Sequence, residues 1–214
     1  MSTGAGRRRD RPVRAETVAR AALALVNSDG LDSLTMRRLA TSLDVQLPTI
    51  YRLFGSKRAL LDEMSETLLA AVPERIAAPG DGVDWRESAA SLARGLRAVL
   101  LEQRDGARIV GGSYAAKRPT LTLVETALAV MHEAGFPAAT AIWANTTLFC
   151  YVLGEVLEQQ GSTGDERELL TEAVRGGEFP RLAAVPAELL LDFDARFEFG
   201  LNIVLTGLHA AVQR

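Results

Sequence analysis

Apolar residues recur every three or four positions along most of this 214-residue chain, which is the period of an amphipathic helix. The spacing predicts a first helix over residues 14–29. Gly30 follows in the position that commonly ends a helix. The apolar face of this helix would hold Val18, Ala21, Ala22, Leu25 and Val26. The pattern therefore predicts an all-α fold.

The next residues predict three more helices. Thr35 is a suitable N-cap for the second, and Pro48 suits the first turn of the third, where its missing N–H costs nothing. Gly55 would end the third helix and Ser56 would cap the fourth. A helix, a turn and a second short helix thus occupy residues 35–54, which is the helix-turn-helix arrangement. The inward side chains would be those of Met36, Leu39, Ala40, Leu43, Ile50, Leu53 and Phe54.

The outward side chains of the third helix are small, hydroxyl-bearing or cationic, as in helices that enter the DNA major groove. Arg37, Lys57 and Arg58 are placed to neutralise flanking phosphates. The alternative is a plain three-helix subdomain in which Tyr51 only covers the core. The candidate DNA-binding residues are Thr35, Arg37, Gln46, Pro48, Thr49, Tyr51, Arg52 and Lys57.

Charge is distributed unevenly, which favours the DNA interpretation. Residues 1–60 hold eleven Lys and Arg against five Asp and Glu, whereas residues 61–214 hold thirteen against twenty-two. A basic head on an acidic body indicates that only the head meets a polyanion. We expect residues 1–13 to form a basic, disordered arm, followed by a helix-turn-helix domain over 14–60.

The pattern of apolar residues over 61–214 predicts a larger helical domain. Its two long helices, 138–160 and 187–212, are apolar over more than one face. Breakers separate the helices, and residues 176–186 are expected to form an ordered loop. The predicted helices cover 58–76, 85–104, 107–115, 119–134, 138–160, 165–175 and 187–212.

Candidate catalytic and metal-binding chemistry is sparse. His132 and His209 lie far apart, without metal-ligand spacing, and Cys150 has no nearby base and is interpreted as a buried structural thiol. We expect no enzyme activity, no cofactor and no metal site. A single cysteine, no secretory signal and no apolar segment of membrane-spanning length predict a cytoplasmic protein without membrane contact.

The sequence over residues 30–64, GLDSLTMRRLATSLDVQLPTIYRLFGSKRALLDEM, resembles the DNA-binding domain of the tetracycline repressor (TetR) family. The resemblance implies DNA contacts by Thr35, Arg37, Pro48, Thr49, Tyr51 and Lys57. Leu47 and Leu53 depart from the tetracycline repressor itself at base-reading positions, and Asp44 replaces the usual glycine of the turn. The operator sequence of that repressor is therefore not transferred to this chain.

Segments beyond residue 61, among them HEAGF, LGEVLEQQ and FEFGLNIVLTGL, resemble the regulatory domain of the tetracycline repressor itself. The resemblance implies a homodimer whose two long helices pair with those of the second copy. Polar groups that hold tetracycline and its magnesium are replaced by Val110, Leu92, Ala127 and Val72–Pro73, and only Glu158 survives. The expected inducer is therefore a largely apolar, polycyclic molecule bound without metal. The candidate ligand-binding residues are Leu92, Leu96, Val110, Ser113, Leu123, Ile142, Asn145, Thr146, Phe149 and Glu158.

These features together predict a homodimeric, ligand-responsive transcriptional repressor. It would bind a near-palindromic double-stranded operator and release it when a small molecule enters the larger domain, controlling an exporter or antibiotic-related genes. The alternative is an all-helical small-molecule-binding protein or enzyme with a vestigial DNA-binding head.

Overall fold

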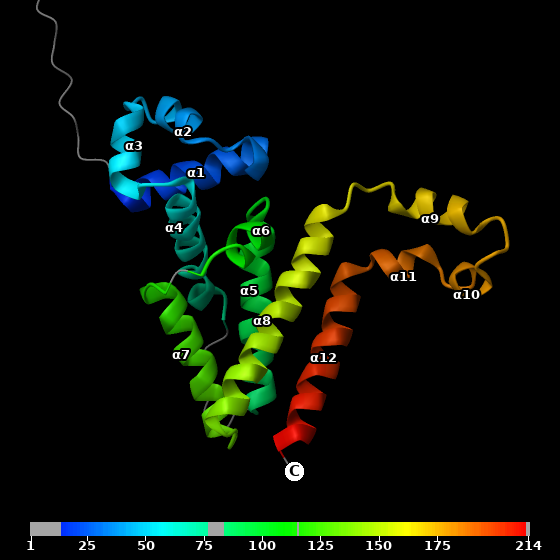
Figure 1. Ribbon diagram of the computed structural model, residues 1–214. Coiled ribbons are helices and arrows are strands. Elements are labelled where there is room, and N and C mark those ends of the chain that lie inside the picture. The colour runs from blue at the N-terminus through cyan, green and yellow to red at the C-terminus, as the bar shows by residue number, and fades with distance from the viewer. Residues whose placement is uncertain (1–13, 77–83, 115, 213–214) are drawn as a thin grey trace, which may run out of the picture.

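The computed structural model describes residues 14–76, 84–114 and 116–212. The predicted arm over residues 1–13 lies outside the described residues. Every regular element in the described ranges is helical, which confirms the all-α prediction. A small head of three helices lies at one end of the molecule, and a longer helical body extends from it (Figure 1).

The head is formed by α1 (Ala15–Asp29), α2 (Met36–Ser42) and α3 (Leu47–Phe54). The predicted helix ends are confirmed. The Thr35 hydroxyl accepts a hydrogen bond from the backbone N–H of Arg38 at 3.1 Å, and Gly30 and Gly55 follow α1 and α3 with φ of 81° and 67°. Such positive φ values are costly for residues that carry a Cβ. The head core contains Val18, Ala22, Val26, Leu39, Ile50 and Phe54.

The turn between α2 and α3 places Asp44 in the left-handed region, with φ of 53°. Glycine adopts this conformation without steric cost, and aspartate is among the few other residues that adopt it readily. The turn therefore keeps the helix-turn-helix geometry despite the missing glycine.

Helix α4 (Lys57–Leu69) connects the head to the body. Ser56 caps it by accepting a hydrogen bond from the backbone N–H of Ala59 at 3.1 Å. The helix is shorter than the predicted 58–76, because the chain leaves it after Leu69 and forms a separate 3-10 turn over Val72–Arg75. Pro73 explains the break, since proline lacks an N–H and disfavours α-helical geometry in the residue before it.

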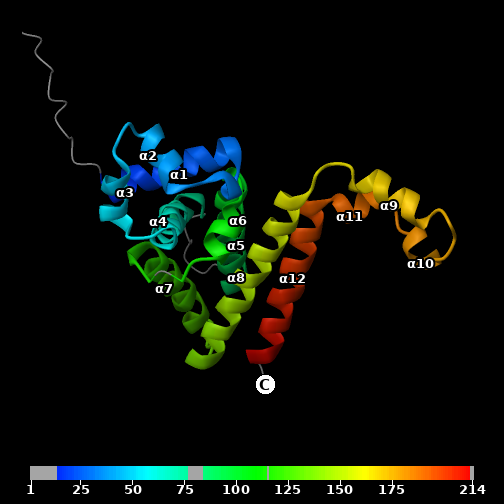
Figure 2. The ribbon, with the colours of Figure 1, turned by 45° about the horizontal axis from the view of Figure 1, so that its top comes forward.

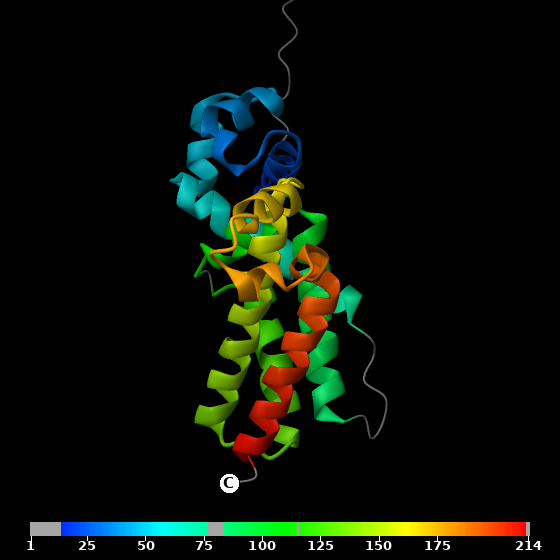
Figure 3. The same ribbon diagram turned by 90° about the vertical axis from the view of Figure 1, so that its right-hand side faces the viewer.

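The body contains α5 (Trp85–Glu102), α6 (Gly106–Gly111), α7 (Arg118–Glu133), α8 (Ala138–Gly161) and α12 (Phe193–Val212). Helices α8 and α12 run side by side, with α5 packed against both (Figures 1 and 3). Helix α7 covers the other side of α8 and α5. The buried core of the body includes Leu96, Leu100, Leu148, Val152, Val156, Phe197 and Leu201.

Three short helices, α9 (Glu166–Val174), α10 (Pro180–Ala183) and α11 (Ala187–Leu191), connect α8 to α12 and extend away from the body (Figure 2). The predicted single helix over 187–212 is divided at Asp192. Its carboxylate accepts a hydrogen bond from the backbone N–H of Ala195 at 3.0 Å, so it caps a new helix instead of continuing the old one. The loop predicted over 176–186 contains α10.

Across these described ranges, no helix combines the length and the apolar content needed to cross a membrane.

Candidate DNA-binding surface and ligand cavity

Helix α3 turns one face into the head and the opposite face to solvent. Ile50 is fully buried and Phe54 nearly so, which fixes the orientation of the helix. Tyr51 is 46% exposed, and Gln46, Pro48 and Arg52 are exposed beside it, whereas Thr49 is half-buried. We call the exposed side chains of Arg37, Gln46, Pro48, Tyr51 and Arg52 the reading surface. The structure thus brings most of the predicted DNA-binding residues to one end of the molecule.

The arginines of the head fall into two groups. Arg38 forms an ion pair with Asp29 and donates to the Ser33 carbonyl, and Arg58 pairs with Asp62. A hydrogen bond from Ser28, with help from Arg38, lowers the pKa of the Asp29 carboxyl below its ordinary value. Arg37 and Arg52 are exposed and form no ion pair with any described residue. Their charges remain available for phosphates or bases.

Thr35 and Lys57 frame this surface. The Thr35 hydroxyl oxygen already accepts the capping hydrogen bond, so this residue would contact DNA through its remaining donor capacity. Lys57 lies at the exposed first turn of α4. Both residues are exposed near the ends of α2 and α3, as expected for contacts to the sugar-phosphate backbone.

Polar contacts attach the head to the body at a second place besides α4. The Asp105 carboxylate accepts a hydrogen bond from the Leu31 backbone N–H at 2.8 Å, and Arg108 pairs with both Asp105 and Asp32 at 2.7 Å. Hydrogen bonding to Arg108 lowers the pKa of the Asp32 carboxyl. Asp105 itself has a left-handed φ of 59° at the start of α6. Movement of α6 would therefore be transmitted to the end of α1.

A cavity of about 500 Å³ lies in the body among α4, α5, α6, α7 and α8. Among the described residues, no Asp, Glu, Lys, Arg or His side chain lines it. The apolar lining includes Leu69, Leu92, Leu96, Val110, Leu123, Met131, Ile142, Leu148, Phe149 and Leu153. The polar lining consists of Ser65, Ser113, Tyr114, Thr120, Asn145, Thr146 and Cys150. This is the usual composition of a site for a drug-sized molecule.

The polar groups of the cavity differ in how many hydrogen-bond donors and acceptors remain available to a ligand. The Thr146 hydroxyl donates to the Ile142 carbonyl of its own helix at 2.8 Å. Ser113 and Thr120 donate to Asp62 and Glu66 of α4, each at 2.8 Å. The Asn145 amide forms no hydrogen bond with a described residue and is the natural anchor for a polar group of the ligand.

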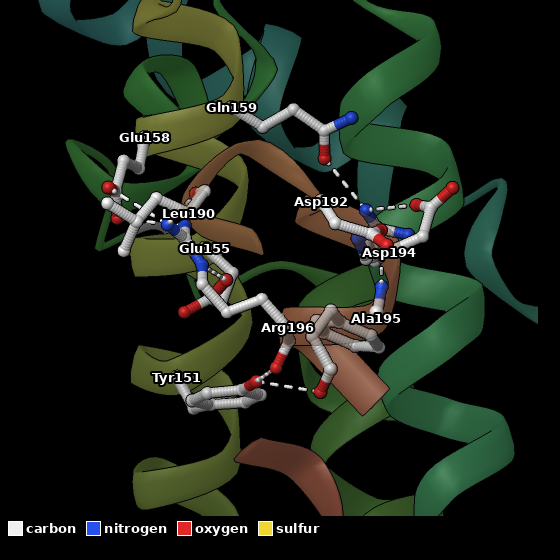
Figure 4. A network of polar contacts seen from close by, with 11 residues as sticks. Tyr151, Glu155, Glu158, Gln159, Leu190, Asp192, Asp194, Ala195 and Arg196 are labelled. Atoms are coloured by element: carbon white, nitrogen blue, oxygen red, sulfur yellow. Dashed lines mark hydrogen bonds and ion pairs between the residues drawn. The ribbon is translucent and has the colours of Figure 1, made fainter. Parts of the chain in front are cut away.

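Nine of the ten predicted ligand-binding residues line this cavity, and Glu158 does not. Glu158 lies on the face of α8 that meets α12, where the Arg196 guanidinium donates to its carboxylate at 2.9 and 3.1 Å (Figure 4). Arg196 also donates to Glu155 at 3.1 Å. In this structure Glu158 holds α12 against α8 instead of lining the cavity.

Two further expectations about single residues change. Cys150 is exposed and lines the cavity, so the prediction of a buried structural thiol was wrong. Leu148 and Val152, two positions before and after Cys150, face the core, which leaves Cys150 on a neighbouring face of α8.

His132 is exposed and His209 stacks on Trp85. Among the residues that the structure describes, no three His, Cys, Asp or Glu side chains gather where a metal ion could bind.

The sequence pattern did not identify Ser65, Leu69, Tyr114, Thr120 and Met131 as cavity residues. Thr120 lies one helical turn before Leu123 on α7, so the 3.6-residue period could have placed it on the same face. No comparable signal in the sequence marks Ser65.

Comparisons with known proteins agree with this architecture. Residues 19–64 match the model for bacterial regulatory proteins of the tetR family, and residues 78–212 match the tetracyclin repressor-like C-terminal domain. The chain is 41% identical over 196 residues to the class A tetracycline repressor protein from transposon 1721 of Escherichia coli, covering 90% of this chain and 88% of the relative.

Solved structures show the same relationship. A possible TetR family regulator from Streptomyces coelicolor A3(2) is 42% identical with a TM-score of 0.83, covering 92% of this chain and 99% of that one. ActR from Streptomyces coelicolor, crystallised with actinorhodin, is 28% identical with a TM-score of 0.84, covering 95% of this chain and all of ActR. The chain described here therefore belongs to the tetracycline repressor (TetR) family of bacterial regulatory proteins.

Proposed function

We propose that this protein is a transcriptional repressor that binds an operator through the head and releases it when a small molecule occupies the body. The observation that carries the proposal is the pairing of an exposed reading surface with an uncharged cavity, joined by one helix, α4. Helix α4 packs on α1 in the head and on α6 and α7 beside the cavity. A change in the cavity therefore has a short mechanical path to the DNA-binding helices.

The ligand that fits this cavity is uncharged, mostly apolar and extended. An ionised group would lose its hydration and find no opposite charge in the described lining. A magnesium–tetracycline chelate would meet the same difficulty, because the residues described in the lining offer no carboxylate or imidazole. ActR has been crystallised with actinorhodin. By analogy we propose an aromatic polyketide or a similar polycyclic compound, with a polar group bound by Asn145.

We further propose that the protein acts as a homodimer through α8 and α12. Trp143 is 71% exposed and shares a face of α8 with Leu157, two heptads later. Phe199 is 70% exposed on the neighbouring α12, followed one turn later by the exposed Ile203. Large apolar side chains exposed on adjacent helices are typical of a protein interface. Two such helix pairs would form a four-helix bundle.

A gel-shift experiment with the promoter region beside its own gene tests the proposal. The protein should shift a near-palindromic fragment, and a scrambled fragment of the same length serves as the control. Uncharged polycyclic compounds should then release the DNA without added magnesium. An enzyme with a vestigial head would show no sequence-dependent shift at physiological salt concentration.

A further inference from the structure

Helix α4 carries three carboxylates that hold the chain at the start of α7. Ser113 donates its hydroxyl hydrogen to Asp62 at 2.8 Å, and the Lys117 ammonium pairs with Glu63. Glu66 accepts three hydrogen bonds, from the backbone N–H groups of Lys117 and Thr120 at 3.1 Å each and from the Thr120 hydroxyl at 2.8 Å. We call these contacts the α4 clamp.

Glu66 is the central residue of the α4 clamp. It is only 4% exposed, which is unusual for a carboxylate outside an ion pair. The start of α7 receives no capping hydrogen bond from its own N-cap side chain, that of Lys117. Glu66 supplies that cap from another helix, and its negative charge lies at the positive end of the α7 dipole. The position of α4 and the first turn of α7 are therefore tied together.

The same hydroxyl groups also face the cavity. Ser113 and Thr120 line it, and Ser65, next to Glu66 in the sequence, lines it from α4. A serine or threonine hydroxyl has one hydrogen to donate. A ligand acceptor that takes the hydrogen of Thr120 or Ser113 removes that bond from Glu66 or Asp62. Cavity occupancy and the α4 clamp thus compete for the same donors.

We propose that Glu66 is the positioning residue through which the cavity controls the head. With the cavity empty, the α4 clamp holds α4, and the head packed on it, in one position relative to the body. A ligand that engages Thr120 weakens the hold of Glu66, and α4 shifts. This inference rests on the proposed ligand-responsive repressor function, which it extends by naming the contact that transmits the response.

The test measures operator affinity by fluorescence anisotropy, with and without saturating Nile red, an uncharged polycyclic dye whose emission reports cavity occupancy. In the parent protein the dye should weaken operator binding about fivefold or more, the usual range of coupling between two sites. Glu66→Gln places an amide N–H₂ group against backbone donors, so the operator affinity should become nearly independent of Nile red. Thr120→Val removes only the hydroxyl bond and should lose part of the response.

Two matched substitutions on the exposed surface of α7 serve as controls. Glu125→Gln and Thr126→Val repeat the same chemical changes away from α4, and both should keep the parent response. Thermal melting separates stability from coupling, because a merely structural role for Glu66 would lower the melting temperature and leave the response to Nile red intact. If Glu66→Gln does not fold, Thr120→Val still decides the question.

The outcomes distinguish the proposed ligand response from the proposed role of Glu66 in it. A parent protein that binds the operator equally well with and without Nile red contradicts the ligand response itself. A responsive parent with equally responsive Glu66→Gln and Thr120→Val variants contradicts only the assignment to Glu66. Reciprocal measurements should agree, since operator DNA must change the affinity for Nile red by the same factor.

Discussion

The Tyr151 ring on α8 lies directly against Gly200 on α12. The Tyr151 hydroxyl donates to the Phe197 carbonyl at 2.7 Å, and a Cβ atom placed at Gly200 would lie 2.4 Å from that hydroxyl oxygen. Burial raises the pKa of Tyr151 to about 12, so its hydroxyl remains a hydrogen-bond donor at neutral pH. The absence of a side chain at Gly200 is what allows α8 and α12 to pack this closely.

Gly200→Ala should therefore destabilise the protein despite the higher helix propensity of alanine. Overpacking of this kind typically costs about 1–3 kcal/mol, which a lower melting temperature would reveal. The control is Gly161→Ala at the end of α8, where a Cβ meets no atom within 4 Å. That substitution should leave the melting temperature unchanged or slightly higher. Equal behaviour of the two variants would contradict the close contact at Gly200.

Removal of exposed side chains from the reading surface should abolish operator binding without unfolding the protein. Tyr51→Ala and Arg37→Ala should each lower the affinity at least about tenfold, because a good base contact is worth about 1–3 kcal/mol and the loss of a phosphate contact weakens binding to every sequence. Arg38→Ala is the matched comparison, since Arg38 is already engaged by Asp29 and the Ser33 carbonyl. Its effect on operator binding should be much smaller. Parent-like binding by both Tyr51→Ala and Arg37→Ala would show that DNA meets a different surface.

Deletion of residues 1–11 should weaken DNA binding and flatten its dependence on salt. The segment contains Arg7, Arg8, Arg9 and Arg11 and lies outside the described residues, so the prediction rests on the sequence alone. Each phosphate contact that is lost should reduce the slope of log K against log salt by about 0.9. Binding titrations at several salt concentrations measure that slope, and an unchanged value would exclude a DNA-binding role for the arm.

Calorimetric titration should detect no tight, magnesium-dependent binding of tetracycline, because no charged side chain from the described part of the chain lines the cavity. An uncharged polycyclic ligand should bind without metal, and Asn145→Ala should weaken it about tenfold by removing the unpaired amide. Thr146→Val should have a smaller effect, since the Thr146 hydroxyl already donates within its own helix. Tight binding of the magnesium–tetracycline complex would refute this account of the cavity.

Trp143→Asp should convert the proposed dimer to monomers, because it buries an unpaired charge in the interface of α8 and α12. Sedimentation velocity measures the change directly. Leu121→Asp provides the comparison, since Leu121 is an exposed apolar residue on α7. That variant should sediment like the parent protein. If the parent itself is a monomer at micromolar concentration, the exposed faces of α8 and α12 need another explanation.

Local signals in the sequence determined most of the head. The caps at Thr35 and Ser56 and the helix ends at Gly30 and Gly55 depend on residues within a few positions of one another. Such hydrogen bonds and backbone preferences form wherever the local sequence allows them. Nine of the residues that the resemblance to the tetracycline repressor family indicated for ligand binding line the cavity.

The tertiary structure alone decided the roles of the carboxylates. Glu158 and Glu66 both lie on long helices, and nothing local distinguishes them. Glu158 meets Arg196, 38 positions later, and turns away from the cavity, whereas Glu66 meets Lys117 and Thr120, 51 and 54 positions later, and caps α7. Each carboxylate takes whichever donors the packing of distant helices brings to it. The helical period specifies on which face of its own helix a side chain lies. Which other helix packs against that face is determined only by the fold of the whole chain.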